Sequence, residues 1–179
     1  MRSGLWTAMV LSVCFAAYAT DQVALTNPGF EMGDKTGWEA EGCGWKISPN
    51  PADISKGNYG VVNVIAPGDE SEWRVIAQAI PAKGGLRYVG GVCVRAMDIG
   101  NAQCWYEVQF LDADWNVLRQ YQTEHVTADQ DFTYVNLPSA DAPPETEMVS
   151  IRGVVHMVRE PDEKVGVIAF DEFQFDRMP

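Results

Sequence analysis

The chain has 179 residues, of which 46% are hydrophobic and 21% are charged, and its formal net charge is -12 at pH 7. This size and apolar content suit one globular domain with a core of its own. A strongly acidic surface repels phosphate backbones and anionic lipid headgroups, so we expect no nucleic-acid partner and no membrane partner. Much of the acidity is explained by solubility alone, and a neutral partner meets no electrostatic penalty.

The first 19 residues have the pattern of a secretory signal peptide. A single charge at Arg2 precedes an apolar run over residues 5–17, and the run ends in the small-x-small sequence Ala17-Tyr18-Ala19. This pattern predicts cleavage after Ala19. The run is shorter than the ~20 residues that span a bilayer. We therefore expect an exported chain, secreted or periplasmic, with residues 20–179 as its single folded domain.

The remainder of the chain has the pattern of an all-β protein. Short alternating runs rich in Val, Ile, Tyr, Phe and Trp recur between clusters of Gly, Pro, Asn and Asp, and no run has convincing helical periodicity. The ten expected strands, in chain order, are 23–26, 37–47, 59–65, 72–80, 86–96, 103–111, 118–126, 132–137, 148–157 and 165–175. Without crossover helices, such strands pair in an antiparallel sandwich or barrel.

Four segments carry a set of motifs in a fixed order. The first is Asn27-Pro28-Gly29-Phe30-Glu31 followed by Gly37-Trp38, and the second is 73–80. The third joins 86–96 to 105–112, with the turn Asp114-Trp115-Asn116-Val117-Leu118 after it, and the fourth is the closing run 169–175. Together they resemble carbohydrate-binding modules of the family 4 and 9 type, over nearly the whole expected mature chain. The resemblance implies a jelly-roll β-sandwich that binds a polysaccharide or glycan on one sheet, often with a structural calcium ion.

Asp171 is a candidate calcium ligand. In one register of the closing run it alternates with Val167, Ala169 and Phe173, which places a carboxylate on a side that should face the core. An ionised carboxylate there needs a partner, and calcium is coordinated by carboxylate and carbonyl oxygens. First and last strands often adjoin in sandwiches, so Glu31 is the natural second ligand.

The opposite register of the closing run leaves two alternatives open. Ile168 and Phe170 make that register apolar too, and it places Asp171 on the outer face. The carboxylate is then either a hydrogen-bonded cap or a plain exposed acid.

Sugar-binding sites pair exposed aromatic rings with polar side chains at the rim, because sugars have flat C–H faces edged by hydroxyls. Position along the predicted strands and the family resemblance select the candidates. They are Trp73, Tyr106, Trp105, Gln103, Arg95 and, in a loop, Trp45. Aromatic residues also fill ordinary cores, and only one of the adjacent pair Trp105 and Tyr106 can face a given side.

Three cysteines remain after the predicted cleavage: Cys43, Cys93 and Cys104. Their spacing fits no zinc ligand set, and export favours disulfide chemistry. If Cys93 and Cys104 lie opposite each other on paired strands, they come close enough for a cross-strand disulfide that leaves Cys43 free. Small buried thiols are the alternative.

Signs of catalysis are weak. His125 and His156 occur without a serine or cysteine nucleophile motif, and no phosphate loop or dinucleotide fingerprint is present. Glu72 and Glu107 are expected to be solvated rim charges. The sequence therefore predicts a non-catalytic glycan-binding domain, with a separate glycoside hydrolase or a surface protein as a further candidate partner. The alternatives are an extracytoplasmic interaction or surface-structure protein that uses the same fold without a sugar site, and a small jelly-roll lyase or hydrolase.

Overall fold

The computed structural model describes residues 21–69, 71–158 and 165–179, so the predicted signal peptide lies outside the described residues. The strands are β1 (Asp21–Gln22), β2 (Glu39–Glu41), β3 (Trp45–Ser48), β4 (Gly60–Ile65), β5 (Trp73–Pro81), β6 (Arg87–Met97), β7 (Ala102–Leu111), β8 (Val117–Gln122), β9 (Gln130–Asp141), β10 (Met148–Met157) and β11 (Gly166–Arg177). One 3-10 turn, η1 (Pro51–Asp53), lies between β3 and β4. The described ranges contain no helix with the length and hydropathy of a bilayer-spanning segment.

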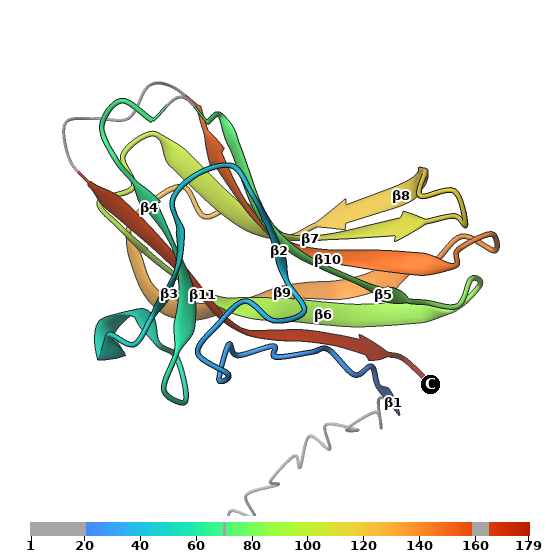
Figure 1. Cartoon of the computed structure of the whole chain (residues 1–179). Helices are drawn as coiled ribbons and strands as arrows, with labels where there is room; N and C mark the ends of the chain where they lie inside the picture. Colours follow the sequence, from blue (N-terminus) through green and yellow to red (C-terminus); the bar gives the residue numbers. More distant parts are fainter. Residues whose placement is uncertain (1–20, 70, 159–164) are drawn as a thin grey trace, which may run out of the picture.

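The strands form two antiparallel sheets that pack as a jelly-roll sandwich, as the sequence predicted (Figure 1). Sheet A has the order β3-β4-β11-β6-β9, with β1 paired to β11 at its end. Sheet B has the order β2-β5-β10-β7-β8. The main core lies between the sheets, and β1 and β11, the first and last strands of the described residues, lie side by side (Figure 1).

The register of β11 changes within the strand. A β-bulge shifts its pairing with β6, and Glu172 at the bulge has a φ of 54°. Ile168 and Phe170 face the core before the bulge, and Phe173 and Phe175 face it after the bulge. Each of the two registers considered from the sequence is therefore correct for part of the strand, because the extra residue switches the side on which alternate residues lie.

Two predicted strands have no single counterpart in the structure. The expected strand 37–47 is two strands in different sheets, because Gly42 and Gly44 between them adopt φ values of 76° and 85°, which redirect the chain from sheet B to sheet A. Residues 23–26 are not a strand. They continue from β1 alongside β11, where Phe173 N donates to Pro28 O at 3.0 Å.

The predicted disulfide is wrong. Cys93 lies on β6 in sheet A, opposite Asp171 and Tyr134, whereas Cys104 lies on β7 in sheet B, opposite Val155. β6 and β7 are consecutive but do not pair, because the connection between them crosses from one sheet to the other. All three cysteines of the described residues are free thiols, and burial raises the pKa of Cys104 to about 12.

Candidate functional site

The outer face of sheet B carries aromatic, charged and amide side chains close together. Alternate residues of its strands point away from the core, and the antiparallel register sets them in rows across the sheet. We call this surface the sheet B face; its central members are Trp73, Val75, Ala77, Gln103, Trp105, Glu107, Gln109, Ser150, Arg152, Val154 and His156. Val75, Trp105 and Val154 form a small apolar cluster here, separate from the main core.

An aromatic cluster occupies one end of the sheet B face. Trp73 is 53% exposed and stacks on His156 with 4.0 Å between ring centroids. Trp105 is only 3% exposed, because His125 stacks on it at 4.1 Å and Trp73 meets its ring edge-on at 5.9 Å. Of these two tryptophans, Trp73 remains available to a ligand, and its neighbours hold it in place.

A polar cluster adjoins these rings at Glu107. Its carboxylate accepts hydrogen bonds from Arg152 Nη1 at 2.5 Å and from Trp105 Nε1 at 3.1 Å. The amides of Gln109 and Gln120 donate to it at 2.9 and 2.8 Å. Glu107 is 3% exposed, so the expectation of a solvated rim charge is wrong. The Arg152 partner neutralises its charge within the sheet B face.

The structure brings three of the predicted ligand residues together and separates the others. Trp73, Trp105 and Gln103 share the sheet B face. Tyr106 is fully buried on the core side of β7, where its hydroxyl donates to Gln174 O at 3.0 Å, and burial raises its pKa well above the usual value. The prediction of Tyr106 as a ligand contact is therefore wrong, because Tyr106 and the outward-facing Trp105 are adjacent strand residues and face opposite sides.

Arg95 and Trp45 lie in sheet A, away from the aromatic cluster. Arg95 Nη1 donates to Ala52 O at 2.9 Å and forms an ion pair with Asp53 at 3.5 Å, so it holds the η1 turn against the sheet. Trp45 packs its ring near Phe170, at 6.1 Å between centroids. Neither residue shares a surface with Trp73.

Sequence reasoning missed four residues of the sheet B face: His125, His156, Glu107 and Arg152. Strand alternation could have indicated three of them, since Glu107 lies on the same side of β7 as Gln103 and Trp105, and Arg152 lies on the same side of β10 as His156. This alternation helps only once it is known which side of each strand faces outward. His125 lies after the end of β8, where no alternation applies.

The two predicted calcium ligands, Glu31 and Asp171, lie where the segment before β2 runs beside β11. Asp171 is fully buried on the outer side of β11, where Ser55 N and Lys56 N donate to its Oδ2 at 2.8 and 3.0 Å and Glu172 N donates to its Oδ1 at 2.8 Å. Burial raises its pKa to about 6, and the three backbone donors oppose that shift. It thus matches the hydrogen-bonded alternative rather than the exposed one.

Glu31 holds the same loop. Asn58 N donates to both of its carboxyl oxygens at 3.0 Å, Tyr59 N donates at 3.2 Å, and these bonds lower its pKa, with that from Asn58 the largest contributor. A Cβ on Gly29 would lie 3.4 Å from Asp171 Oδ1 and 3.8 Å from Glu31 Cγ, so both side chains border Gly29. The hard oxygen donors suit calcium, although the described residues include no cluster of three or more acidic, histidine or cysteine ligands.

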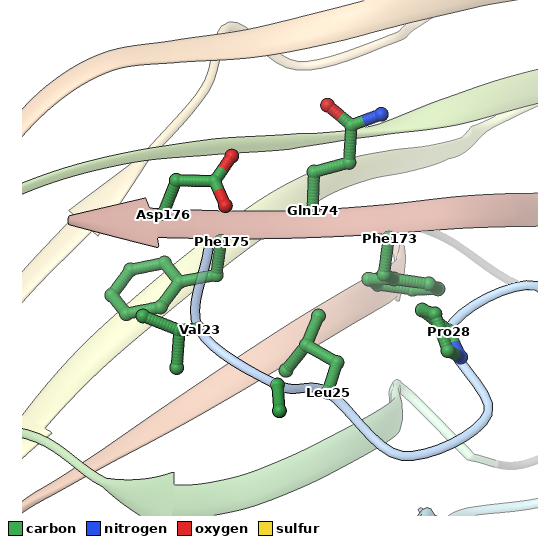
Figure 2. A pocket seen from close by; sticks show the side chains of 8 residues that line it. Val23, Leu25, Pro28, Phe173, Gln174, Phe175 and Asp176 are labelled. Atoms are coloured by element: carbon green, nitrogen blue, oxygen red, sulfur yellow. The ribbon is translucent and has the colours of Figure 1, made fainter. Parts of the chain in front are cut away.

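A hollow of about 590 Å³ lies elsewhere, between residues 23–28 and the end of β11. Figure 2 shows Phe173 and Phe175 on one side of β11 with Val23 and Leu25, and Gln174 on the other side. The two phenylalanine rings are 2% and 1% exposed. The hollow therefore presents no aromatic ring face that could stack on a sugar.

The chain matches no protein-family model and no curated protein. Among solved structures it is similar to TmCBM61 in complex with β-1,4-galactotriose, with a TM-score of 0.61 and 20% identity, over 86% of this chain and 97% of that one. It is also similar to the CBM22-1 xylan-binding domain from Paenibacillus barcinonensis Xyn10C, with a TM-score of 0.56 and 20% identity, over 89% and 97% of the two chains.

A third similar structure is the enzymatically active domain of bacteriophage CBA120 tailspike protein 4, with a TM-score of 0.67 and 14% identity. That match covers 88% of this chain but only 21% of the tailspike chain. At these identities the comparisons show a shared fold. The modules among these neighbours belong to families 22 and 61, and the narrower resemblance to families 4 and 9 stays a prediction.

Proposed function

We propose that this chain is an exported, non-catalytic carbohydrate-binding domain that takes a neutral polysaccharide or glycan chain on the sheet B face. The observation that carries the proposal is the exposed ring of Trp73, fixed by its stack on His156, next to the polar cluster around Glu107. An aromatic platform beside fixed amides and charges offers a sugar both the contacts it needs: its C–H face meets the ring and its hydroxyls meet the polar groups.

The charges favour a neutral glycan. Glu107 and Arg152 compensate each other on the face itself, and the chain as a whole carries a formal charge of -12. An anionic polysaccharide would meet repulsion during its approach. The similar modules, whose names record galactotriose and xylan as ligands, support a binding role on this fold.

Calcium at Asp171 and Glu31 is also a proposal. The buried carboxylate of Asp171 forms no ion pair with a cationic side chain among the described residues, and the side chain of Glu31 borders the same glycine, Gly29. The ion would hold the loop at residues 55–59 and the closing strand together, through oxygens of these two side chains.

A glycan array followed by calorimetric titration with the best ligand tests the proposed function. Trp73→Ala should weaken binding by about tenfold or more, because the stacking contact is lost. Trp115→Ala is the matched control, since Trp115 is 60% exposed in the turn between β7 and β8 and should leave binding unchanged. Binding that survives Trp73→Ala would refute the sheet B face as the site. No binding to any glycan would favour a protein-interaction role, and release of reducing ends would indicate an enzyme.

A further inference from the structure

One glutamine joins the two histidines of the chain. Gln103 Nε2 donates to His156 Nδ1 at 2.9 Å, and Gln103 Oε1 accepts from His125 Nδ1 at 3.1 Å. Each histidine in turn stacks on a tryptophan: His156 on Trp73, and His125 on Trp105. The half-buried Gln103 is therefore connected, through two imidazoles, to both tryptophans of the aromatic cluster.

The chemistry of an amide restricts what the two imidazoles can do. An amide side chain presents N–H donors at one end and a carbonyl acceptor at the other. Whichever way Gln103 is turned, one of the two facing Nδ1 atoms must accept a hydrogen bond and the other must donate one. A protonated histidine carries a proton on Nδ1, so both histidines cannot be protonated while both bonds to Gln103 persist.

We propose that Gln103 is a positioning residue of the sheet B face, whose single amide holds His125 and His156 in opposite hydrogen-bonding states and thereby fixes Trp73 for the glycan. The inference rests on the proposed function and goes beyond it. Gln103 was predicted to contact the ligand, and we assign it instead to holding the histidine that stacks on Trp73. The position of the Trp73 ring then depends on pH.

The two imidazoles have different surroundings. His156 faces Glu72, whose Oε1 lies 3.2 Å from its Nε2, and also Gln103, Trp73 and Trp105. A proton on His156 gains an ion pair with Glu72 and requires Gln103 to turn over.

The surroundings of His125 disfavour its protonated form. His125 packs on Trp105 and bonds to Gln103. Partial burial lowers its pKa, nearby His156 lowers it further, and Glu107 acts in the opposite sense. The geometry thus allows one protonated imidazole at a time beside Gln103, and a second proton requires one bond to Gln103 to break.

An NMR titration of the ligand-free domain tests the coupling without any glycan. The chain holds two histidines, so a tag-free protein gives two imidazole signals, which His125→Asn assigns. In the wild type the two histidines should take up protons in two separate steps, because the sites interact through one amide. Gln103→Glu replaces the donor end by a second acceptor, so both imidazoles can be protonated, and the two steps should move to higher pH and merge. Equal and independent titrations, unchanged by Gln103→Glu, would overturn the proposal.

Glycan affinity supplies the second measurement. Gln103→Ala should weaken binding at pH 7 by about fivefold, the loss of roughly one hydrogen-bonded support. The pH profile of wild-type affinity should follow the first histidine titration and move to higher pH in Gln103→Glu. Asn136→Ala, an exposed amide of β9 in sheet A, is the control and should change neither quantity. Affinities of Gln103→Ala equal to wild type at every pH would overturn the positioning role. A wild type that binds no glycan would refute the proposed function instead, while the NMR titration still decides the coupling.

Discussion

Removing the carboxylate of Glu107 should destabilise the domain more than almost any other change on the sheet B face. Glu107→Ala takes away the acceptor of hydrogen bonds from Arg152, Trp105, Gln109 and Gln120. Breaking a buried ion pair by deleting one partner costs about 3–5 kcal/mol, because the remaining charge is left uncompensated.

The position of Arg152 sets the expected loss within that range. Its side chain is 20% exposed, against 4% for that of Glu107, so the orphaned guanidinium can recover some hydration. We therefore expect the lower end, about 3 kcal/mol of unfolding free energy. For a domain of this size, this corresponds to a fall in Tm of about 6–12 °C. Glu107→Gln keeps the side-chain shape and one acceptor oxygen, and should lose about 1–2 kcal/mol.

Urea unfolding at pH 7, read by tryptophan fluorescence, measures these losses, and a double-mutant cycle isolates the pair. If Arg152 is destabilising once it is unpaired, adding Arg152→Ala to Glu107→Ala should cost much less than Arg152→Ala alone. Folded protein must be confirmed for each variant by its circular dichroism. A Glu107→Ala domain within about 1 kcal/mol of the wild type, or strictly additive effects in the cycle, would refute the buried network as a source of stability.

Two further predictions concern Asp171. Its pKa is about 6 in the folded domain against an ordinary 3.8, so its ionisation opposes folding fully above pH 6 and not at all below about pH 4. In chelator, the wild type should therefore gain about 2–3 kcal/mol relative to Asp171→Asn between pH 7 and pH 4, and a gap in urea stability that stays constant with pH would contradict this. Calcium should raise the wild-type Tm at pH 7 and leave Asp171→Asn unaffected; melting curves that are the same in calcium and in EDTA would exclude a structural ion.

The fold was largely predictable, because alternation and turn chemistry are local properties. The predicted strand 148–157 coincides with β10, and the ends of most others lie within a few residues of the observed ones. The prediction failed for which strands pair with each other. Cys93 and Cys104 lie on consecutive strands, yet whether such strands form a hairpin or cross between sheets depends on contacts far along the chain. The bulge at Glu172 could not be predicted either, because both registers of the closing strand are apolar and the sequence does not show where one gives way to the other.

The site was predictable only in part. Trp73 was selected correctly as an outward aromatic residue, but Tyr106 was placed on the surface because adjacent residues of a strand carry no mark of which one faces the core. The histidines were missed because each looks isolated in sequence; the antiparallel pairing of β10 with β7 is what places His156 opposite Gln103. Residues that act through one another across strands are visible only after the register is known.

The two outer faces of the sandwich differ in a way that selects the binding side. On sheet A, the loop after η1 closes over the centre: Ser55 N and Lys56 N are bound to Asp171, and Arg95 is bound to Ala52 O. These polar groups of sheet A already form hydrogen bonds within the chain. On the sheet B face, Trp73 is half exposed. A glycan can therefore stack on the ring of Trp73 without breaking a hydrogen bond of the chain, whereas on the covered part of sheet A it would have to break the bonds that hold the loop.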